Sequence, residues 1–310
     1  MTESTQSAST LQNWKLILAY DGTEFSGWQV QPGETTVQGE LKAALGRVVG
    51  ESPLPQGSGR TDAGVHALGQ VASFELQARI PAENLQRALN RTLPGAIRVL
   101  EARTVANTFH ARHSAVAKTY EYRVFRGEVC PPFLARYVHA CAWPMDVEKL
   151  DGSARMFVGE HDFLSFAATD PDLATRQSPA PIFDEGSEPF PDGKARRIGA
   201  IRTIFSSGWE ERNTSIGRLL VYQVRGNGFL HHMVRNLVGT MLDVGRGYTN
   251  VDEIPAILEA RSRAAAGPTA PAQGLFLHSV EYGEAGVWGM GTAIPTDRHW
   301  TGLPAFALLT

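Results

Sequence analysis

Short runs of apolar residues alternate along the chain with polar turns, and they predict a series of β-strands. The first run, Trp14 to Tyr20, is apolar and prone to form a strand, and it ends at Asp21-Gly22, a pair typical of turns. Comparable runs predict further strands at residues 70–76, 97–102, 119–125, 198–209, 218–225 and 274–282.

Other apolar residues recur at helical spacing and predict four helices between these strands. The first runs from Val37 to Val49, with Thr35 and Gln38 as a capping box at its start and Gly50 at its end. Three more helices are expected: one that begins at Pro81, one that is capped by Asp146 and runs to Gly159, and one from Leu230 to Met241.

Each half of the chain therefore has strands and two helices in α+β order, which predicts two related sheet-and-helix domains with a cleft between them. The 310 residues suffice for two domains of ordinary size. We expect a flexible tail at 1–13, a first domain at 14–144, a second domain at 145–283 and a C-terminal tail at 284–310. Residues 167–197 contain five prolines and six acidic residues, so we expect a surface insertion there.

Charge is distributed unevenly along the chain, although the net charge is only −3. Residues 79–136 carry nine arginines and one lysine against four glutamates, whereas residues 160–192 carry eight acids against one arginine. The basic stretch can follow a phosphate backbone, which points to a nucleic acid partner, or it can be an ordinary solvated surface.

The composition is that of an ordinary globular protein, with 43% hydrophobic and 20% charged residues. No apolar run reaches the length of a membrane span, and the polar N-terminus does not resemble a signal peptide. Two cysteines, Cys130 and Cys141, do not make a disulfide framework. We therefore expect a cytoplasmic protein without a membrane partner.

The turn at residues 57–66, Gly-Ser-Gly-Arg-Thr-Asp-Ala-Gly-Val-His, is the strongest candidate site. Its glycines force the backbone through tight turns, and a strand anchors it, an arrangement common at functional sites. Asp62 can be catalytic, or it can cap its own backbone. The glycine spacing fits neither a dinucleotide fingerprint nor a phosphate-binding loop. Asp62 and His66 can ligate a metal, but no third ligand lies nearby in sequence.

A second candidate site is the stretch Phe109-His110-Ala111-Arg112-His113. Its aromatic ring, imidazoles and guanidinium can stack on RNA and pair with it. The alternative is a turn with ordinary surface residues.

Tyr120 and Arg235 are further candidates. Tyr120 and Tyr122 share one face of a predicted strand, where tyrosines usually pack in the core. Arg235 lies on an apolar predicted helix, where a buried guanidinium needs an acidic partner. His231 and His232 are expected to point to different faces and so to make a poor metal pair.

The string Gly-Arg-Thr-Asp-Ala-Gly-Val-His resembles the signature of the tRNA pseudouridine synthase A family, and other segments resemble further parts of the family's pattern. They are Tyr-Asp-Gly and Gly-Trp-Gln within 20–29, Asn-Arg-Thr-Leu-Pro at 90–94, Phe-His-Ala-Arg at 109–112, Tyr-Glu-Tyr at 120–122, Glu-His-Asp-Phe-Leu-Ser-Phe at 160–166, Phe-Leu-His-His-Met-Val-Arg-Asn at 229–236 and Gly-Leu-Phe-Leu at 274–277. The resemblance implies two ferredoxin-like (RRM-like) halves that share an extended antiparallel sheet, with helices on one face and a central cleft.

The resemblance also implies a function: isomerisation of uridine to pseudouridine in the anticodon stem-loop of tRNA, at nucleotides 38–40. The enzyme would be a homodimer that needs neither a cofactor nor a metal. The family's catalytic aspartate corresponds to Asp62, and Arg60 beside it would help to hold the flipped-out nucleotide. Tyr120 would stack on the target base, and Arg235 would pair with Asp62 and keep it ionised. The family pattern places four residues against tRNA, Phe109, His110, Ala111 and Arg112, and we expect the adjacent His113 to bind RNA with them.

Two other functions are consistent with the sequence. A non-catalytic RNA-binding protein with RRM-like sheets would bind tRNA without forming product. A metal hydrolase that uses Asp62, His66 and the His231/His232 pair would lose its activity in a chelator.

Overall fold

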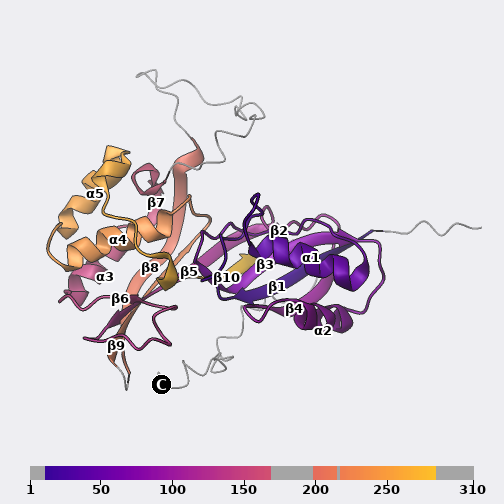
Figure 1. Cartoon of the computed structure of the whole chain (residues 1–310). Helices are drawn as coiled ribbons and strands as arrows, with labels where there is room; N and C mark the ends of the chain where they lie inside the picture. The colour runs from indigo at the N-terminus through magenta and orange to yellow at the C-terminus, as the bar shows by residue number, and fades with distance from the viewer. Residues whose placement is uncertain (1–10, 169–197, 215–216, 284–310) are drawn as a thin grey trace, which may run out of the picture. The chain divides into compact units, whose positions relative to one another are not determined.

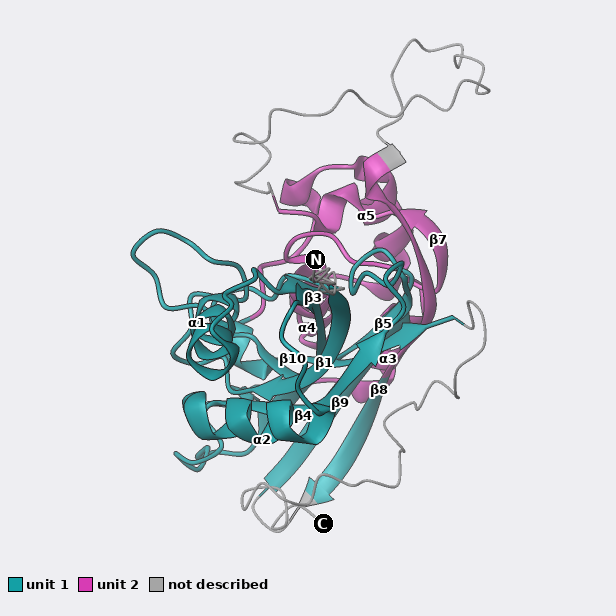
Figure 2. Cartoon of the chain, turned by 90° about the vertical axis from the view of Figure 1, so that its right-hand side faces the viewer, with its two compact units in different colours: residues 1–143, 209–227, 271–310 teal, residues 144–208, 228–270 magenta. Residues whose placement is uncertain are grey.

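The computed structural model describes residues 11–168, 198–214 and 217–283. The chain divides into two compact units (Figure 2). Unit 1 consists of Met1–Trp143, Trp209–Asn227 and Pro271–Thr310, and unit 2 consists of Pro144–Gly208 and Gly228–Ala270. The predicted C-terminal tail lies outside the described residues, as do nearly all of the predicted N-terminal tail and of the insertion.

The described strands of unit 1 form a large sheet in the order β4-β1-β3-β10-β5-β9-β8 (Figure 1). Their bounds are β1 Gln12–Tyr20, β3 His66–Leu76, β4 Ile97–Val105, β5 Ala115–Arg126, β8 Ile201–Thr214, β9 Gly217–Gly226 and β10 Leu275–Tyr282. The pairing is mostly antiparallel, but β10 runs parallel to β3. Two short strands extend the sheet: β2 (Gln56–Gly57) pairs with β3, and β6 (His139–Ala140) pairs with β5. Every strand predicted from the sequence is present, and the described chain has a mixed α+β fold.

Strand β8 is longer than the sequence predicts. We expected a loop at 210–217, but residues 210–214 continue the strand. Glu211 there lies 3.6 Å from Arg126 on β5 and 3.6 Å from Arg218 on β9. Polar residues form a strand at this point because the neighbouring strand satisfies their backbone groups, which apolar periodicity does not report. In unit 2, residues 201–204 of β8 pair with β7 (Gly159–Asp162).

Helices α1 (Val37–Val49) and α2 (Ala82–Thr92) pack on each other, and α2 packs on β4. Gly50 ends α1 with a φ of 75°, as predicted. The predicted capping box is wrong: Thr36 caps the helix, and its hydroxyl accepts from the Gly39 N–H at 3.2 Å. Gln38 instead binds the N–H of Val30 and the carbonyl of Pro55, because it is buried under two loops.

Unit 2 contains α3 (Val147–Arg155), α4 (Met233–Gly245) and α5 (Ile254–Ala260). Asp146 caps α3 through the N–H groups of Glu148 and Lys149, as predicted, but the helix ends before Gly159, which begins β7. Helix α4 begins at Met233 and not at Leu230. Among the described residues, no helix has both the length and the apolar character that crossing a membrane requires.

Candidate active site

The predicted catalytic turn lies between β2 and β3 in unit 1, and Asp62 is half-buried on it. The N–H of Val65 donates to the carbonyl of Asp62 at 3.1 Å, which closes the turn around the acid. Gly64 has a φ of 76°, a conformation that favours glycine. Gly64 therefore lets the chain turn back on itself directly after Asp62.

The loop between β1 and α1 holds this turn from one side. The Trp28 N–H donates to the carbonyl of Thr61 at 3.0 Å, and the Gly64 N–H donates to the carbonyl of Phe25 at 3.2 Å. Gly27 has a φ of 89°, and a Cβ there would lie 2.6 Å from the Thr61 oxygen. Only glycine lets the two backbones approach this closely. The loop therefore fixes the position of the turn's backbone next to Asp62.

Buried polar side chains of β1 and β3 also hold the turn in place through hydrogen bonds. The hydroxyl groups of Tyr20 and Thr61 lie 2.8 Å apart. The amide of Gln70 donates to the carbonyl of Gly59 at 2.9 Å, and its oxygen accepts from the Ser58 hydroxyl at 2.7 Å. Burial raises the pKa of Tyr20 to about 12, despite its hydrogen bonds with Thr61 and Gln70. The phenol therefore stays neutral, and its hydroxyl group supports the turn through hydrogen bonds.

Tyr120 stands beside the turn on β5 and is 7% exposed. Its hydroxyl lies near Gly59, where an added Cβ would be 3.7 Å from the phenol oxygen. Burial raises the pKa of Tyr120, and electrostatic interactions with Tyr20 and Asp62 raise it further. Lys118, two residues before it, donates to the Ser58 carbonyl at 2.6 Å. The neighbouring strand thus ties the turn and the tyrosine together.

His66, at the end of the turn, is almost fully buried and stacks on Phe276 with ring centres 4.7 Å apart. Its Nδ1 lies 3.0 Å from the N–H of Gly22, and its Nε2 lies 2.9 Å from the carbonyl of Arg136. An imidazole that accepts through Nδ1 carries its proton on Nε2 and donates it there. Both ring nitrogens are used within unit 1, so His66 is not available as a metal ligand.

Residues 109–113, which we call the RNA segment because RNA binding is predicted for them, lie in unit 1 between β4 and β5. Ala111 is buried, whereas Arg112 and His113 are exposed. The Nδ1 of His110 accepts from the Arg112 N–H at 3.1 Å, and its ring lies 4.3 Å from that of His113. Burial lowers the pKa of His110, and the nearby charges of His113 and Arg112 lower it further. The segment thus forms a tight turn with Arg112 and His113 exposed.

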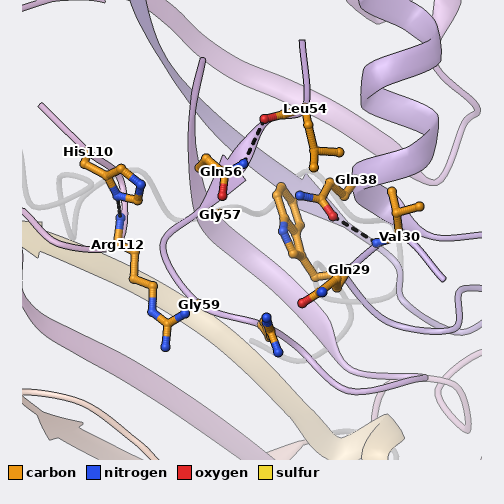
Figure 3. A pocket seen from close by; sticks show the side chains of 11 residues that line it. Gln29, Val30, Gln38, Leu54, Gln56, Gly57, Gly59, His110 and Arg112 are labelled. Carbon is orange, nitrogen blue, oxygen red and sulfur yellow. Dashed lines mark hydrogen bonds between the residues drawn. The ribbon is translucent and has the colours of Figure 1, made fainter. Parts of the chain in front are cut away.

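An open pocket of about 170 Å³ lies between the catalytic turn and the RNA segment (Figure 3). His110 and Arg112 stand on one side of it, and Val30 and Leu54 stand on the other. Arg60 also lines the pocket. The structure therefore places two of the predicted RNA-binding residues and Arg60 around one cavity, whose opposite side combines Val30 and Leu54 with Gln29 and Gln38.

Arg60, Asp62, Tyr120 and the RNA segment thus lie together in unit 1. Arg235 lies on α4 in unit 2, is half-buried, and donates through Nε to the Ala270 carbonyl at 2.8 Å. The pairing of Arg235 with Asp62 stays a prediction.

The prediction that His231 and His232 point to different faces is wrong. Their rings lie 4.0 Å apart, because His232 has a φ of 58° and turns the backbone just before α4. The helical spacing on which the prediction depended therefore does not apply at this position.

Sequence reasoning missed the residues that support the turn from below: Tyr20, Ser58, Gln70 and Lys118. The available signals were that Tyr20 lies in a segment that resembles the family pattern and that Ser58 lies in the candidate turn itself, and neither assigned a supporting role to these residues. Their function becomes visible only where the strands pair.

Comparisons of the sequence with known proteins identify the family. A sequence model of the family described as tRNA pseudouridine synthase matches residues 16–114 and 190–283. The chain is 50% identical over 268 residues to tRNA pseudouridine synthase A of Solibacter usitatus, covering 86% of this chain and 98% of the relative. It is 42% identical over 272 residues to tRNA pseudouridine synthase A 1 of Desulfotalea psychrophila, covering 88% and 100%. It is 43% identical over 270 residues to tRNA pseudouridine synthase A of Moorella thermoacetica, covering 86% and 98%. With this identity over most of its length, the chain belongs to the tRNA pseudouridine synthase family.

Proposed function

We propose that this protein isomerises uridine to pseudouridine in tRNA and that Asp62 is its catalytic residue. The observation that carries the proposal is the position of Asp62, which stands on a turn held from two sides, next to the buried ring of Tyr120. A carboxylate held in this way meets a bound nucleotide in one defined geometry. The relatives are named tRNA pseudouridine synthase A, which supports the same reaction here.

The reaction is an isomerisation, so nothing is added to the substrate overall. The N1–C1′ bond of the nucleotide breaks, the base turns, and C5 bonds to C1′. C5 loses a proton and N1 gains one, so atoms and electrons balance without an oxidant or reductant. An ionised Asp62 can act as a nucleophile at the sugar or as a base at C2′.

The residues around Asp62 would bind the target nucleotide. Tyr120 would stack on the uracil ring, and Arg60 would hold the nucleotide after it leaves its stem. Arg235 would keep Asp62 ionised by opposite charge. Its Nε donates to the Ala270 carbonyl at 2.8 Å, and the planar shape of a guanidinium suits it to bind a carboxylate through two nitrogens.

The RNA segment would contact the tRNA backbone and bases. Arg112 and His113 are exposed, and His110 and Arg112 line the pocket beside the turn, which supports a contact at this surface.

Further parts of the proposal concern the whole molecule. The substrate region would be the anticodon stem-loop, and the enzyme would work in the cytoplasm as a homodimer. Its fold would consist of two ferredoxin-like halves with a cleft between them, divided near residue 144. The family match supports tRNA as the substrate, and the other assignments follow from the resemblance seen in the sequence.

The decisive experiment is a pseudouridine assay on an unmodified tRNA transcript in the presence of EDTA, with the modified positions mapped. Wild-type protein should form pseudouridine in the anticodon stem-loop. Asp62→Asn should bind the tRNA but form no detectable product. Asp252→Asn is a matched control, because it removes an exposed carboxylate from unit 2 and should leave activity unchanged.

Each alternative predicts a different result in this assay. A non-catalytic RNA-binding protein would bind the transcript and leave every uridine unchanged. A metal hydrolase would cleave RNA only without EDTA. Product formation by Asp62→Asn at a rate near that of wild type would show that Asp62 is not the catalyst.

A further inference from the structure

Side chains from three strands fasten the RNA segment to the sheet. From β1, the Asn13 amide donates to the Phe109 carbonyl at 2.8 Å. From β3, the Ser73 hydroxyl accepts from the Ala111 N–H at 3.0 Å, and from β10 the Tyr282 hydroxyl donates to the Ala111 carbonyl at 2.8 Å. These hydrogen bonds therefore fix the backbone of the RNA segment at Phe109 and Ala111, directly before its exposed end.

Lys15 on β1 lies beside two of these residues, Phe109 and Tyr282, and is only 7% exposed. Its Nζ lies 4.5 Å from the centre of the Tyr282 ring and 5.6 Å from the centre of the Phe109 ring. The two rings are themselves 4.9 Å apart. An ammonium in this position is attracted by both rings, and the attraction grows as the cation loses water.

Apart from the two aromatic rings, the groups around Lys15 do little to stabilise its positive charge. Burial and, after it, the charge of Arg103 lower the pKa of Lys15 to about 8, while Glu101 opposes both effects. Glu101 is engaged by Arg103 at 3.2 Å. At neutral pH the amine still carries its proton, so the aromatic rings are its main partners in place of water.

We propose that Lys15 is a positioning residue for tRNA binding: its ammonium, held by the rings of Phe109 and Tyr282, fixes the RNA segment so that His110 and Arg112 form one side of the pocket. Lys15 is buried, so it acts through the segment and does not touch the RNA. The inference rests on the proposed function, because it takes the RNA segment as a tRNA contact.

The test compares steady-state kinetics on a tRNA transcript at pH 7 for Lys15→Met, Lys15→Arg and wild type. Methionine keeps the apolar stem and leaves no buried charge, so the variant should fold. Lys15→Met should raise KM about three- to tenfold, the range of a cation–π contact, with kcat within about twofold of wild type. Lys15→Arg keeps the cation and should restore KM to within about twofold. Lys42→Met, on the exposed face of α1, is the matched control for a lost charge and should change neither constant.

Arg112→Ala and the double variant Lys15→Met/Arg112→Ala separate this inference from its premise. A rise in KM for Arg112→Ala, with no further rise in the double variant, supports positioning through the segment. A rise for Arg112→Ala without one for Lys15→Met overturns the inference and leaves the proposed RNA contact intact. No rise for either single variant overturns the contact itself. An equal rise for Lys15→Met and Lys15→Arg also contradicts the proposal. Lys15→Gln carries the same expectations if the methionine variant does not fold.

Discussion

Tyr120 serves the core of unit 1 and, in our proposal, the target base as well. Its ring is 7% exposed, so the face available for stacking is small and most of the ring packs against neighbours. Truncation to alanine would leave a cavity and cost on the order of 3–5 kcal/mol of stability, which would confuse a binding experiment. Leucine fills most of the space and has no π-face, so it is the better probe.

We predict that Tyr120→Leu weakens tRNA binding by about 1–3 kcal/mol through the loss of base stacking. Tyr120→Phe keeps the ring and should bind about as tightly as wild type. The dissociation constant of each folded variant, measured on an unmodified transcript, checks this. Equal affinities for the leucine and phenylalanine variants would show that Tyr120 does not stack on a base.

Arg235 is half-buried, and one of its nitrogens is bound by a backbone carbonyl. If the rest of the guanidinium pairs with Asp62, each single substitution leaves a charge without its partner. We therefore predict that Arg235→Leu and Asp62→Asn each lower the free energy of unfolding, and that the double variant recovers part of the loss.

The measurement is a double-mutant cycle by denaturant unfolding. Arg235→Leu should also lower activity at neutral pH, because Asp62 would ionise less readily. Strict additivity of the two stability changes would assign Arg235 to a different acid.

The loop between β1 and α1 acts as a unit in holding the catalytic turn. Gly27 and Gly33 both lie in this loop with positive φ values, 89° and 78°. A Cβ on Gly27 would meet the Thr61 oxygen at 2.6 Å, whereas a Cβ on Gly33 would meet no atom within 4 Å. The two positions share the same backbone strain and differ in the contact with the turn.

We predict that Gly27→Ala lowers kcat on the order of 10²-fold, because the clash displaces the backbone of Asp62. Gly33→Ala should cost about 1–2 kcal/mol of stability from its backbone conformation and leave kcat unchanged. Comparison of kcat and of the free energy of unfolding for the two variants separates displacement of the turn from strain. Equal kcat values would mean that this loop does not position Asp62.

The molecule as a whole is slightly acidic, although we propose an RNA partner. Binding must then depend on where the positively charged side chains lie. In the RNA segment, the exposed side chain of Arg112 lines the pocket beside the turn. We predict that tRNA affinity falls as salt rises, by roughly 0.7–0.9 log units per phosphate contact for each tenfold increase.

Arg112→Ala should reduce this salt slope by about one phosphate contact. Arg47→Ala, on the exposed face of α1, should leave the slope unchanged. Dissociation constants at several salt concentrations provide the check, and an affinity that does not depend on salt would contradict an electrostatic contact.

The amino-acid sequence by itself determined the strands and helices with clear periodicity and the position of the candidate site. A strand or helix with one apolar face is specified by residues a few positions apart, so β1, β5 and α1 were predicted close to their observed bounds. The signature around Asp62 is likewise a local string. The roles assigned to Asp62, Tyr120, Arg60 and Arg235 come from resemblance and stay predictions.

Only the tertiary structure decided what supports these local features. The choice of Thr36 over Thr35 as the cap of α1 and the extension of β8 through polar residues depend on neighbouring loops and strands. The burial of Lys15 and the support of the catalytic turn also depend on residues that are distant in the sequence. Asn13 and Phe109, which are hydrogen-bonded beside Lys15, are 96 positions apart, and Tyr20 and Thr61, which are hydrogen-bonded at the turn, are 41 positions apart. Hydrogen bonds and ring contacts act over a few ångströms in space, whatever the separation along the chain. A pattern read within a short window therefore cannot report them.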